Sequence, residues 1–212
     1  METPVGVRTT LGKGWGSALC VAFLLAVAFL LIAAFPYLLG NEEKLSRYDG
    51  RRAWLLVHIV TATIPLLIGP VQLWLGFTSP QGKFHRKLGM IYLCSIAVSS
   101  VAAYYLAFNT GVSSTFGFGL GGLATCWVVT CTMAMLAIKR RDVRSHMQWM
   151  VRSYVATFAF VCFRVLVVAF TILDTGTMID RLNWASWLCW VVPLVVCEMV
   201  IQFRSGAKSS TP

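Results

Sequence analysis

Apolar residues gather in six long blocks along the chain, and short polar or basic segments separate them. The blocks cover residues 16–39, 53–77, 88–107, 116–138, 147–172 and 184–203. A helix needs about 20 apolar residues to cross the roughly 30 Å hydrocarbon layer of a bilayer, and each block has about that length. The pattern therefore predicts an all-α fold, a polytopic integral membrane bundle of six transmembrane helices.

The same pattern predicts one folded unit between two short tails. We expect an N-terminal tail over residues 1–15, the six-helix transmembrane domain over 16–203 and a C-terminal tail over 204–212. The first block is longer than the roughly 7–15 apolar residues of a signal peptide, which favours a first helix that is retained. No linker rich in proline and serine divides the blocks, so we expect a single domain.

Composition supports a membrane location. Of the 212 residues, 58% are hydrophobic and only 12% are charged, whereas soluble domains carry about 25% charged residues. This balance excludes a disordered chain, an ordinary cytosolic enzyme and a nucleic-acid-binding domain. The net charge of +10 would suggest DNA on a soluble protein, but here the basic residues lie between hydrophobic blocks. We expect the lipid bilayer of the cell or plasma membrane as the surroundings.

Lysine and arginine are unequally divided between alternate connections, which predicts the orientation. Eleven lie in the two tails and in the second and fourth connections: Arg8, Lys13, Lys83, Arg86, Lys87, Lys139, Arg140, Arg141, Arg144, Arg204 and Lys208. Five lie on the opposite side: Lys44, Arg47, Arg51, Arg52 and Arg181. Because cytoplasmic loops carry the excess of basic residues, we expect both termini in the cytoplasm.

Polar side chains at membrane depth fall on single faces of the expected helices. In the second helix they follow the helical period, as His58, Thr61, Pro65, Gly69 and Gln72. We expect this face to contact other helices, because lipid offers no hydrogen bonds. Pro65 and Pro70 lack a backbone N–H, so they free carbonyl oxygens of this helix for other partners.

Two more helices carry such a face. The third has His85, Gly89, Tyr92 and Ser99 close to one line, and the fifth has His146, Trp149, Ser153, Thr157, Phe160 and Arg164. On the expected topology, His85, His146, Arg152 and Glu198 lie near the cytoplasmic interface. His58 and Arg164 lie nearer the outer side.

Two histidines at one end of the bundle predict a cofactor site. His85 and His146 each open a helix, whose positive end favours the neutral imidazole that can bind a metal. Together they can ligate one b-type haem, with Arg86, Arg152 or Arg144 pairing its propionates. A small redox-linked membrane protein is therefore the leading hypothesis.

Other uses of these groups stay open. The histidine pair with Glu198 or His58 can instead hold a transition metal. Equally, the site can hold no cofactor, because interfacial residues of these types often bond only to lipid phosphates and backbone carbonyls.

Two hypotheses of other classes stand beside this one. In the first, the protein is a cofactor-free membrane enzyme that acts on a prenyl, quinone or other lipid-like substrate, with Glu198, His58 and His146 as acid and base groups. In the second, it is a non-catalytic transporter or assembly subunit, with a second copy or a membrane complex as partner. Whether the protein is an enzyme is left open.

Three ordered motifs carry a resemblance. They are His58 followed by Gly69-Pro70-Val71-Gln72, then His85-Arg86-x-x-Gly89-x-x-Tyr92, then His146-x-x-Trp149-Met150-x-Arg152-Ser153-Tyr154. From about residue 53 to the sixth helix, the chain resembles predicted membrane proteins catalogued as domain of unknown function 2306. The resemblance implies no activity, but it places these histidines, with Gln72, Arg86, Arg152 and Ser153, in one motif set.

The six-helix frame is also distantly similar to di-haem b561-type reductases. Those proteins have two pairs of ligating histidines, whereas this chain has three histidines in total. The resemblance therefore leaves room for at most one bis-histidine haem.

Overall fold

The computed structural model describes residues 15–79 and 82–209, and all the regular structure in these segments is helical. Six spans are long and apolar enough to cross a membrane: Gly16–Leu38, Arg52–Thr78, Lys83–Phe108, Ser114–Lys139, Val143–Ile172 and Met178–Arg204. The predicted all-α bundle of six transmembrane helices is confirmed. The predicted N-terminal tail lies outside the described residues except for Trp15, whereas the predicted C-terminal tail is described up to residue 209.

The first span consists of α1 (Trp15–Phe29), the π-helix η1 (Leu30–Ala34) and α2 (Phe35–Leu38). Two short helices follow it, α3 (Glu42–Leu45) and the 3-10 helix η2 (Ser46–Tyr48). The other spans are single helices: α4 (Arg52–Thr78), α5 (Lys83–Phe108), α6 (Ser114–Lys139), α7 (Val143–Ile172) and α8 (Met178–Ser209).

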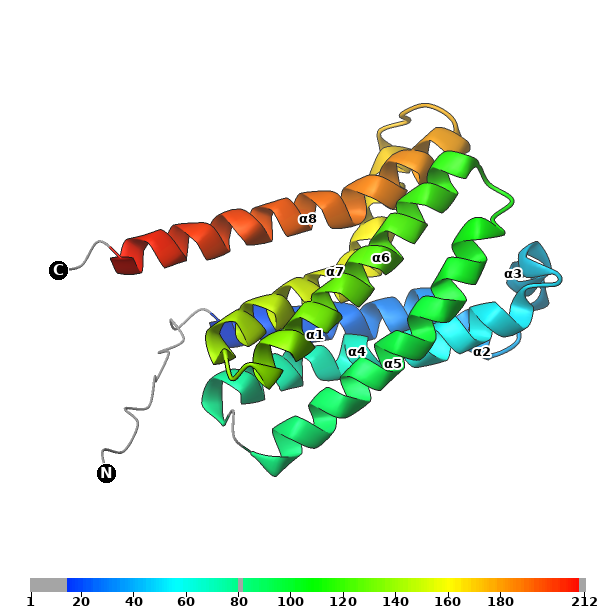
Figure 1. The fold of residues 1–212 in the computed structure, drawn as a ribbon. Coiled ribbons are helices and arrows are strands. Elements are labelled where there is room, and N and C mark those ends of the chain that lie inside the picture. The colour runs from blue at the N-terminus through cyan, green and yellow to red at the C-terminus, as the bar shows by residue number, and fades with distance from the viewer. Residues whose placement is uncertain (1–14, 80–81, 210–212) are drawn as a thin grey trace, which may run out of the picture.

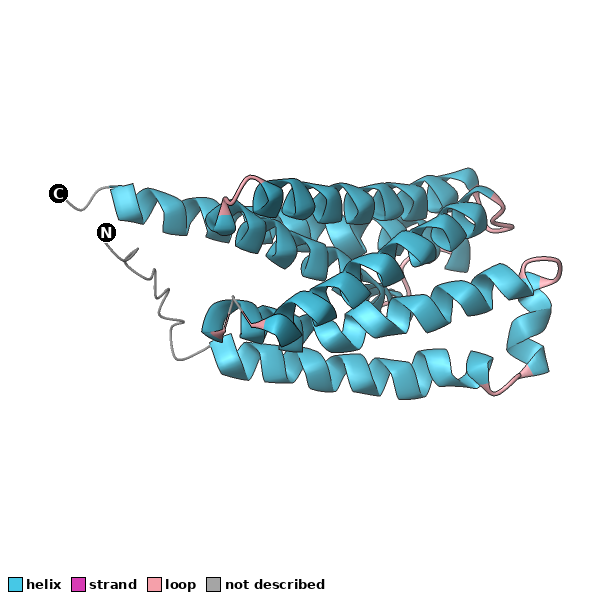
Figure 2. Cartoon of the chain, turned by 60° about the horizontal axis from the view of Figure 1, so that its bottom comes forward, coloured by secondary structure: helices cyan, strands magenta, loops and turns pink. Residues whose placement is uncertain are grey.

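The two ends of the bundle differ in what they carry. In Figure 1, α1 (blue) begins and α8 (red) ends at the same end, which we call the terminal end. Helix α4 ends, helix α5 begins and the connection after α6 lies at this end too, and α3 marks the opposite, far end. Figure 2 shows that the long helices run along the bundle and that loops occur at its two ends. Which end faces the cytoplasm stays a prediction.

Several helices extend beyond the hydrophobic blocks into polar sequence. Helix α5 begins at Lys83, α7 at Val143 and α8 at Met178, and α8 continues to Ser209. The predicted helices therefore began too late, at 88, 147 and 184, and the last one ended too early, at 203. Side-chain caps explain two of the early starts, because a capped first turn is stable without apolar residues.

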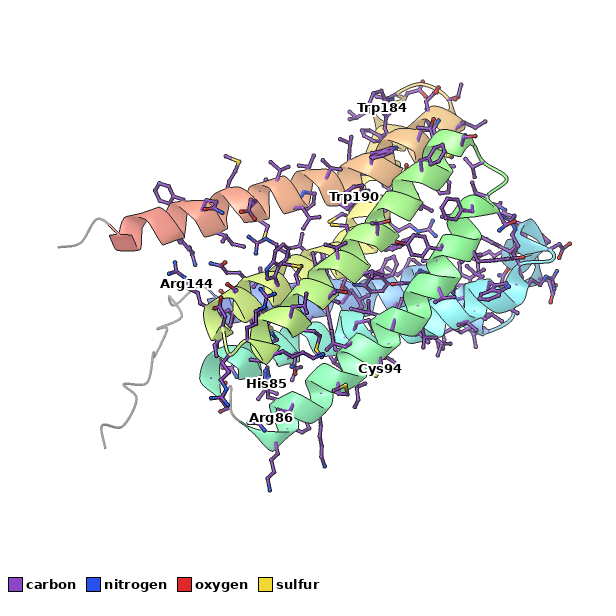
Figure 3. The ribbon with its side chains drawn as sticks, viewed as in Figure 1. His85, Arg86, Cys94, Arg144, Trp184 and Trp190 are labelled. Atoms are coloured by element: carbon purple, nitrogen blue, oxygen red, sulfur yellow. The ribbon has the colours of Figure 1, made fainter. Side chains whose placement is uncertain are left out.

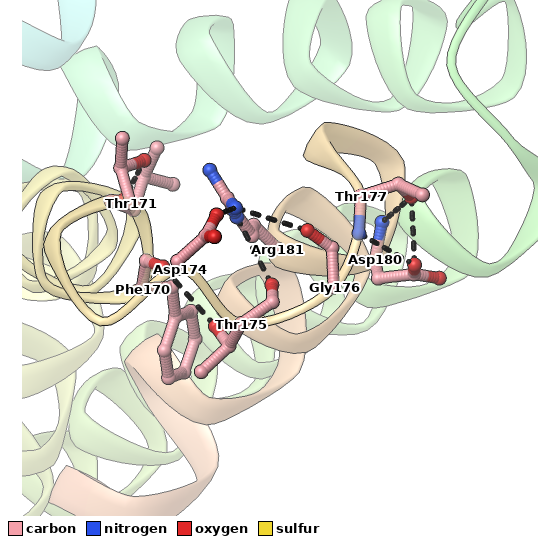
Figure 4. Close-up of polar contacts among 9 residues, drawn as sticks. Phe170, Thr171, Asp174, Thr175, Gly176, Thr177, Asp180 and Arg181 are labelled. Carbon is pink, nitrogen blue, oxygen red and sulfur yellow. Dashed lines mark hydrogen bonds and ion pairs between the residues drawn. The ribbon is translucent and has the colours of Figure 1, made fainter.

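Asp142 caps α7 and Thr177 begins the cap of α8. A carboxylate oxygen of Asp142 accepts from the backbone N–H of Ser145 at 2.9 Å, and this bond lowers the pKa of the Asp142 carboxyl. Before α8, the Thr177 N–H and hydroxyl donate to Asp180, and the Asp180 N–H donates back to the Thr177 hydroxyl (Figure 4). This reciprocal arrangement is a capping box.

The π-helical turn of the first span has a local cause. Pro36 lacks a backbone N–H, and its ring would collide with the carbonyl oxygen four residues before it in a regular α-helix. Widening the preceding turn avoids that collision. Helix α2 then starts at Phe35, with Pro36 in its first turn.

The tightest contact between α4 and α7 is made by a glycine and a tyrosine. A Cβ added at Gly69 would overlap the ring of Tyr154, so only glycine allows this approach. The Tyr154 hydroxyl donates to the Leu66 carbonyl at 3.4 Å. In a regular helix that carbonyl would accept from residue 70, which is Pro70 and has no N–H. The predicted release of a carbonyl for a partner is therefore seen at Pro70.

Helices α4 to α7 form the packed centre, and α8 joins it by its first half. Neighbours along the chain pack together from α4 to α8, α6 also contacts α8, and α1 lies against α4 and α7. The buried residues of α8 up to residue 204 are Ala185, Ser186 and Cys189. Beyond them α8 diverges from α6 and α7 (Figure 1). Large apolar side chains cover the outside, as a lipid-facing surface requires.

Candidate functional site

His146 is held in the first turn of α7 by a bond to α6. Its Nδ1 lies 2.9 Å from the backbone oxygen of Ala134. A carbonyl oxygen only accepts hydrogen bonds, so Nδ1 carries a proton, and in the neutral imidazole Nε2 then has the lone pair. Metal-bound histidines are usually oriented by the same kind of bond.

His85 lies in the first turn of α5, at the same end. Its Nδ1 is buried and has no partner among the described residues. Its ring lies against Gly76 of α4, where a Cβ would be in ordinary van der Waals contact with Cε1 of His85, at 3.4 Å. The two imidazoles are close enough for His85 and His146 to interact electrostatically. Figure 3 shows His85 and Arg86 at the terminal end, where Arg144 of α7 also lies.

Gln72 joins α4 to this site. Its Nε2 donates to the backbone oxygen of His85 at 3.1 Å, and a Cβ at Gly89 would lie 2.7 Å from the same nitrogen. Because the His85 carbonyl can only accept, the amide must turn its NH₂ toward it. The other amide atom, Oε1, is therefore an acceptor, and it is buried without a partner among the described residues.

Arg86 and Arg152, two of the arginines predicted to pair haem propionates, have different surroundings. Arg86 is exposed in the first turn of α5. Arg152 forms an ion pair with Glu198 of α8, with Nη2 at 2.6 Å and Nε at 2.9 Å from the same carboxylate oxygen. Its guanidinium also lies 4.5 Å from the ring centre of Trp149. Arg86 is therefore open to an anionic ligand, whereas Arg152 is engaged with Glu198.

His58 and Glu198 are not brought together. Nδ1 of His58 lies 2.9 Å from Oγ of Ser99, and its ring packs against Phe160 of α7. Glu198 bonds to Arg152, eight residues before Phe160 on that helix, which is about 12 Å along the axis. His58 lies toward the far end and Glu198 toward the terminal end. They do not form one acid–base pair.

No group of three or more His, Cys, Asp or Glu side chains in the described segments could hold a metal ion. The pair His85 and His146 therefore has no third ligand of these types nearby. In particular, neither Glu198 nor His58 completes a metal site with the two histidines.

A buried hydroxyl network occupies the centre of the bundle. The Tyr92 hydroxyl lies 3.0 Å from the hydroxyl of Ser153 and 2.9 Å from that of Thr157. Trp127 of α6 donates from Nε1 to the Thr157 hydroxyl at 2.8 Å, and Sγ of Cys131 lies 3.2 Å from the Ser153 hydroxyl. The sequence placed Tyr92, Ser153 and Thr157 on inward faces, but it did not indicate the two residues from α6.

Arg164 was expected on the same face of α7 as His146, toward the other end of the helix, but it does not lie in the helix interface. It is exposed, although it shares the period of the inward-facing residues of α7. It interacts electrostatically with Tyr48 in η2, together with Arg47 and Arg51. Burial raises the pKa of the Tyr48 phenol, and the three arginines partly oppose that rise. Arg164 therefore belongs to the far-end surface rather than to the helix interface.

Comparisons with known proteins agree with this architecture. A family model described as predicted membrane protein (DUF2306) matches residues 55–201, from the first turn of α4 to a point within α8. No match is found among curated proteins or among solved structures. The matched region includes the three histidines, Gln72, the Arg152–Glu198 pair and the hydroxyl network. The chain, a multi-pass integral membrane protein, therefore belongs to the DUF2306 family of predicted membrane proteins.

Proposed function

We propose that the protein binds one b-type haem at the terminal end, with His85 and His146 as axial ligands. The observation that carries this proposal is the bond from His146 to the Ala134 carbonyl, which leaves Nε2 of His146 as a free electron-pair donor. His85 supplies a second imidazole on a neighbouring helix, close enough to interact with the first. Bis-histidine ligation by two helices is a common way to hold a b-type haem.

The donor set favours haem over a bare metal ion. A bare transition metal is usually held by three or four protein ligands, and these two histidines have no third partner of that kind in the described segments. Haem iron already has four nitrogens from the macrocycle and needs only two more ligands. Exposed Arg86 supplies a positive charge for a propionate. A haem held there would transfer single electrons, which makes the protein redox-linked.

The test is an absorbance spectrum of the full chain, purified in mild detergent from cells supplied with haem, before and after reduction with dithionite. We expect a Soret band, with sharp α and β bands after reduction. His85→Ala and His146→Ala should each lose the bound haem. His58→Ala is the matched control, because it removes the third histidine from the other end of the bundle and should keep a full complement of haem.

A folding control separates ligand loss from misfolding. His85→Met keeps a ligand of the kind that haem proteins use, so it should retain haem with a changed spectrum and a raised reduction potential. A colourless wild-type protein that is monodisperse and folded would overturn the proposal, as would full haem content in both alanine variants. The two hypotheses left to distinguish would then be a cofactor-free enzyme and an assembly subunit.

A further inference from the structure

Polar groups that haem ligation does not use line the interface of α4, α5 and α7 over most of its length. From the terminal end they begin with Gln72, which is 4% exposed. The hydroxyl network around Tyr92 comes next, and Tyr92 itself is fully buried. Toward the far end follows His58, bonded to the fully buried Ser99. Tyr92 and Ser99 are seven residues apart on α5, so they share one face.

Among the described residues, buried polar atoms without a partner lie along this line on both sides of the hydroxyl network. Oε1 of Gln72 and Nδ1 of His85 lie on its terminal side. Oγ of Ser100, a residue that is 3% exposed, lies on its far side beside Ser99. Leaving such groups unbonded costs about 1–3 kcal/mol each, and buried water molecules usually satisfy them. The pattern therefore calls for water on both sides of the hydroxyl network.

We propose that α5 carries a water-assisted proton pathway between the Gln72 position and His58. Water at Gln72 passes a proton toward the hydroxyls of Ser153, Tyr92 and Thr157. Water near Ser95 and Ser100 then continues the path to Ser99 and His58. Ser95 is buried on α5 between Tyr92 and Ser99, so it adds a hydroxyl to the part of the path between those two residues.

Protons are conserved along the path. Each hydroxyl accepts a proton on one side and gives up its own on the other, so no group changes its charge over a complete transfer. His58 accepts at one ring nitrogen and releases from the other, which an imidazole can do in either direction. The pathway requires no titration of His85 or His146, so it stands apart from haem binding.

The measurement is proton flux in vesicles of phosphatidylcholine and phosphatidylglycerol containing the full chain. A pH-sensitive dye is trapped inside, and a potassium gradient with valinomycin sets the membrane potential. Wild-type vesicles should acidify faster than protein-free vesicles. Tyr92→Phe should slow the flux by about tenfold, the factor that corresponds to about 1.4 kcal/mol in the barrier. His58→Gln should slow it similarly.

Thr130→Ala is the matched control. Thr130 is as buried as the network hydroxyls, but its hydroxyl bonds only to carbonyls of its own helix. Its flux should equal that of the wild type. Thr157→Val, which keeps the side-chain shape, provides a second test within the path. Melting temperatures of all variants identify any that fail to fold.

Two results would overturn the proposal. One is wild-type flux equal to that of protein-free vesicles. The other is flux that persists at full rate in Tyr92→Phe, Thr157→Val and His58→Gln. His85→Ala separates this proposal from the haem proposal, because it keeps the backbone carbonyl that holds Gln72 and should conduct protons without haem.

Discussion

The ring of Tyr154 lies directly against Gly69, and its hydroxyl reaches the Leu66 carbonyl that Pro70 leaves without its helical partner. One side chain of α7 thus fills the space that a glycine provides and satisfies a polar group that a proline exposes. Because Gly69, Pro70 and Gln72 are neighbours, this contact also fixes the helix that presents Gln72 to His85.

Gly69→Ala should destabilise the protein by about 1–3 kcal/mol, because the added methyl group overlaps the Tyr154 ring and forces α4 and α7 apart. The measurement is the melting temperature in detergent. Gly121→Ala is the matched control, since a Cβ there would meet only Phe108, at 4.0 Å. Alanine is the better helix former, so that control should melt at the same temperature or higher. Equal melting of the two variants would contradict the packing described.

Removing one partner of the Arg152–Glu198 pair should cost more than removing both. Arg152 is 13% exposed and Glu198 is 43% exposed, so Glu198→Leu leaves a mostly buried cation unpaired. We expect a loss of about 2 kcal/mol, between the values for exposed and fully buried pairs. Arg152→Met combined with Glu198→Leu should recover part of it. Denaturant titration of the single and double variants measures the coupling, and purely additive losses would argue against the ion pair.

The cap of α7 should make the start of that helix sensitive to acid. The pKa of Asp142 is lowered in the folded protein, so its contribution to stability is present above the unfolded pKa and is lost as the pH falls through the folded pKa. Hydrogen exchange in the first turn of α7 should therefore speed up below about pH 4. Asp142→Asn should remove this pH dependence, whereas Asp142→Ala should loosen the turn at every pH. An unchanged pH profile in Asp142→Asn would assign the effect to another group.

Arg181 should matter more to the loop before α8 than its ion-pair partner does. Its side chain donates to the carboxylate of Asp174 and to the backbone oxygens of Thr175 and Gly176 (Figure 4). Asp174 is 94% exposed, and an exposed ion pair contributes little. Arg181→Ala should therefore speed hydrogen exchange across 174–177. Asp174→Asn, which tolerates the positive φ of 50° at that position, should leave exchange nearly unchanged.

Most of the fold could be predicted from hydrophobicity alone, because a bilayer requires long apolar helices and permits few alternatives. The helix starts could not, since they depend on local caps such as Asp142 and Thr177 rather than on apolar length. From the prolines of the second helix, it could be predicted that a freed carbonyl oxygen would find a partner outside its own helix. Its identity as Tyr154 depends on how far α7 is displaced along α4, which no single helix pattern specifies.

The candidate site was only partly predictable. Helical period placed His85 and His146 at one end and Tyr92 and Ser153 on inward faces. It could not pair Arg152 with Glu198, because pairing across two antiparallel helices depends on their relative depth. Both residues lie a few helical turns from the terminal end, and this similar depth was the one feature of the sequence that could have indicated the pair. Cys131 was missed because a thiol on an apolar face is usually a packing residue.

The position of α1 has a consequence for insertion into the membrane. The family region, residues 55–201, begins in α4 and ends in α8, so it crosses the bilayer an odd number of times. A polypeptide limited to that region would have to translocate one of its own ends. The first span adds a sixth crossing, so the beginning of α1 at Trp15 lies on the side where α8 ends. It packs against α4 and α7 and adds the buried Leu19 and Ala26 to the core, so α1 determines the topology of the chain as well as joining the bundle.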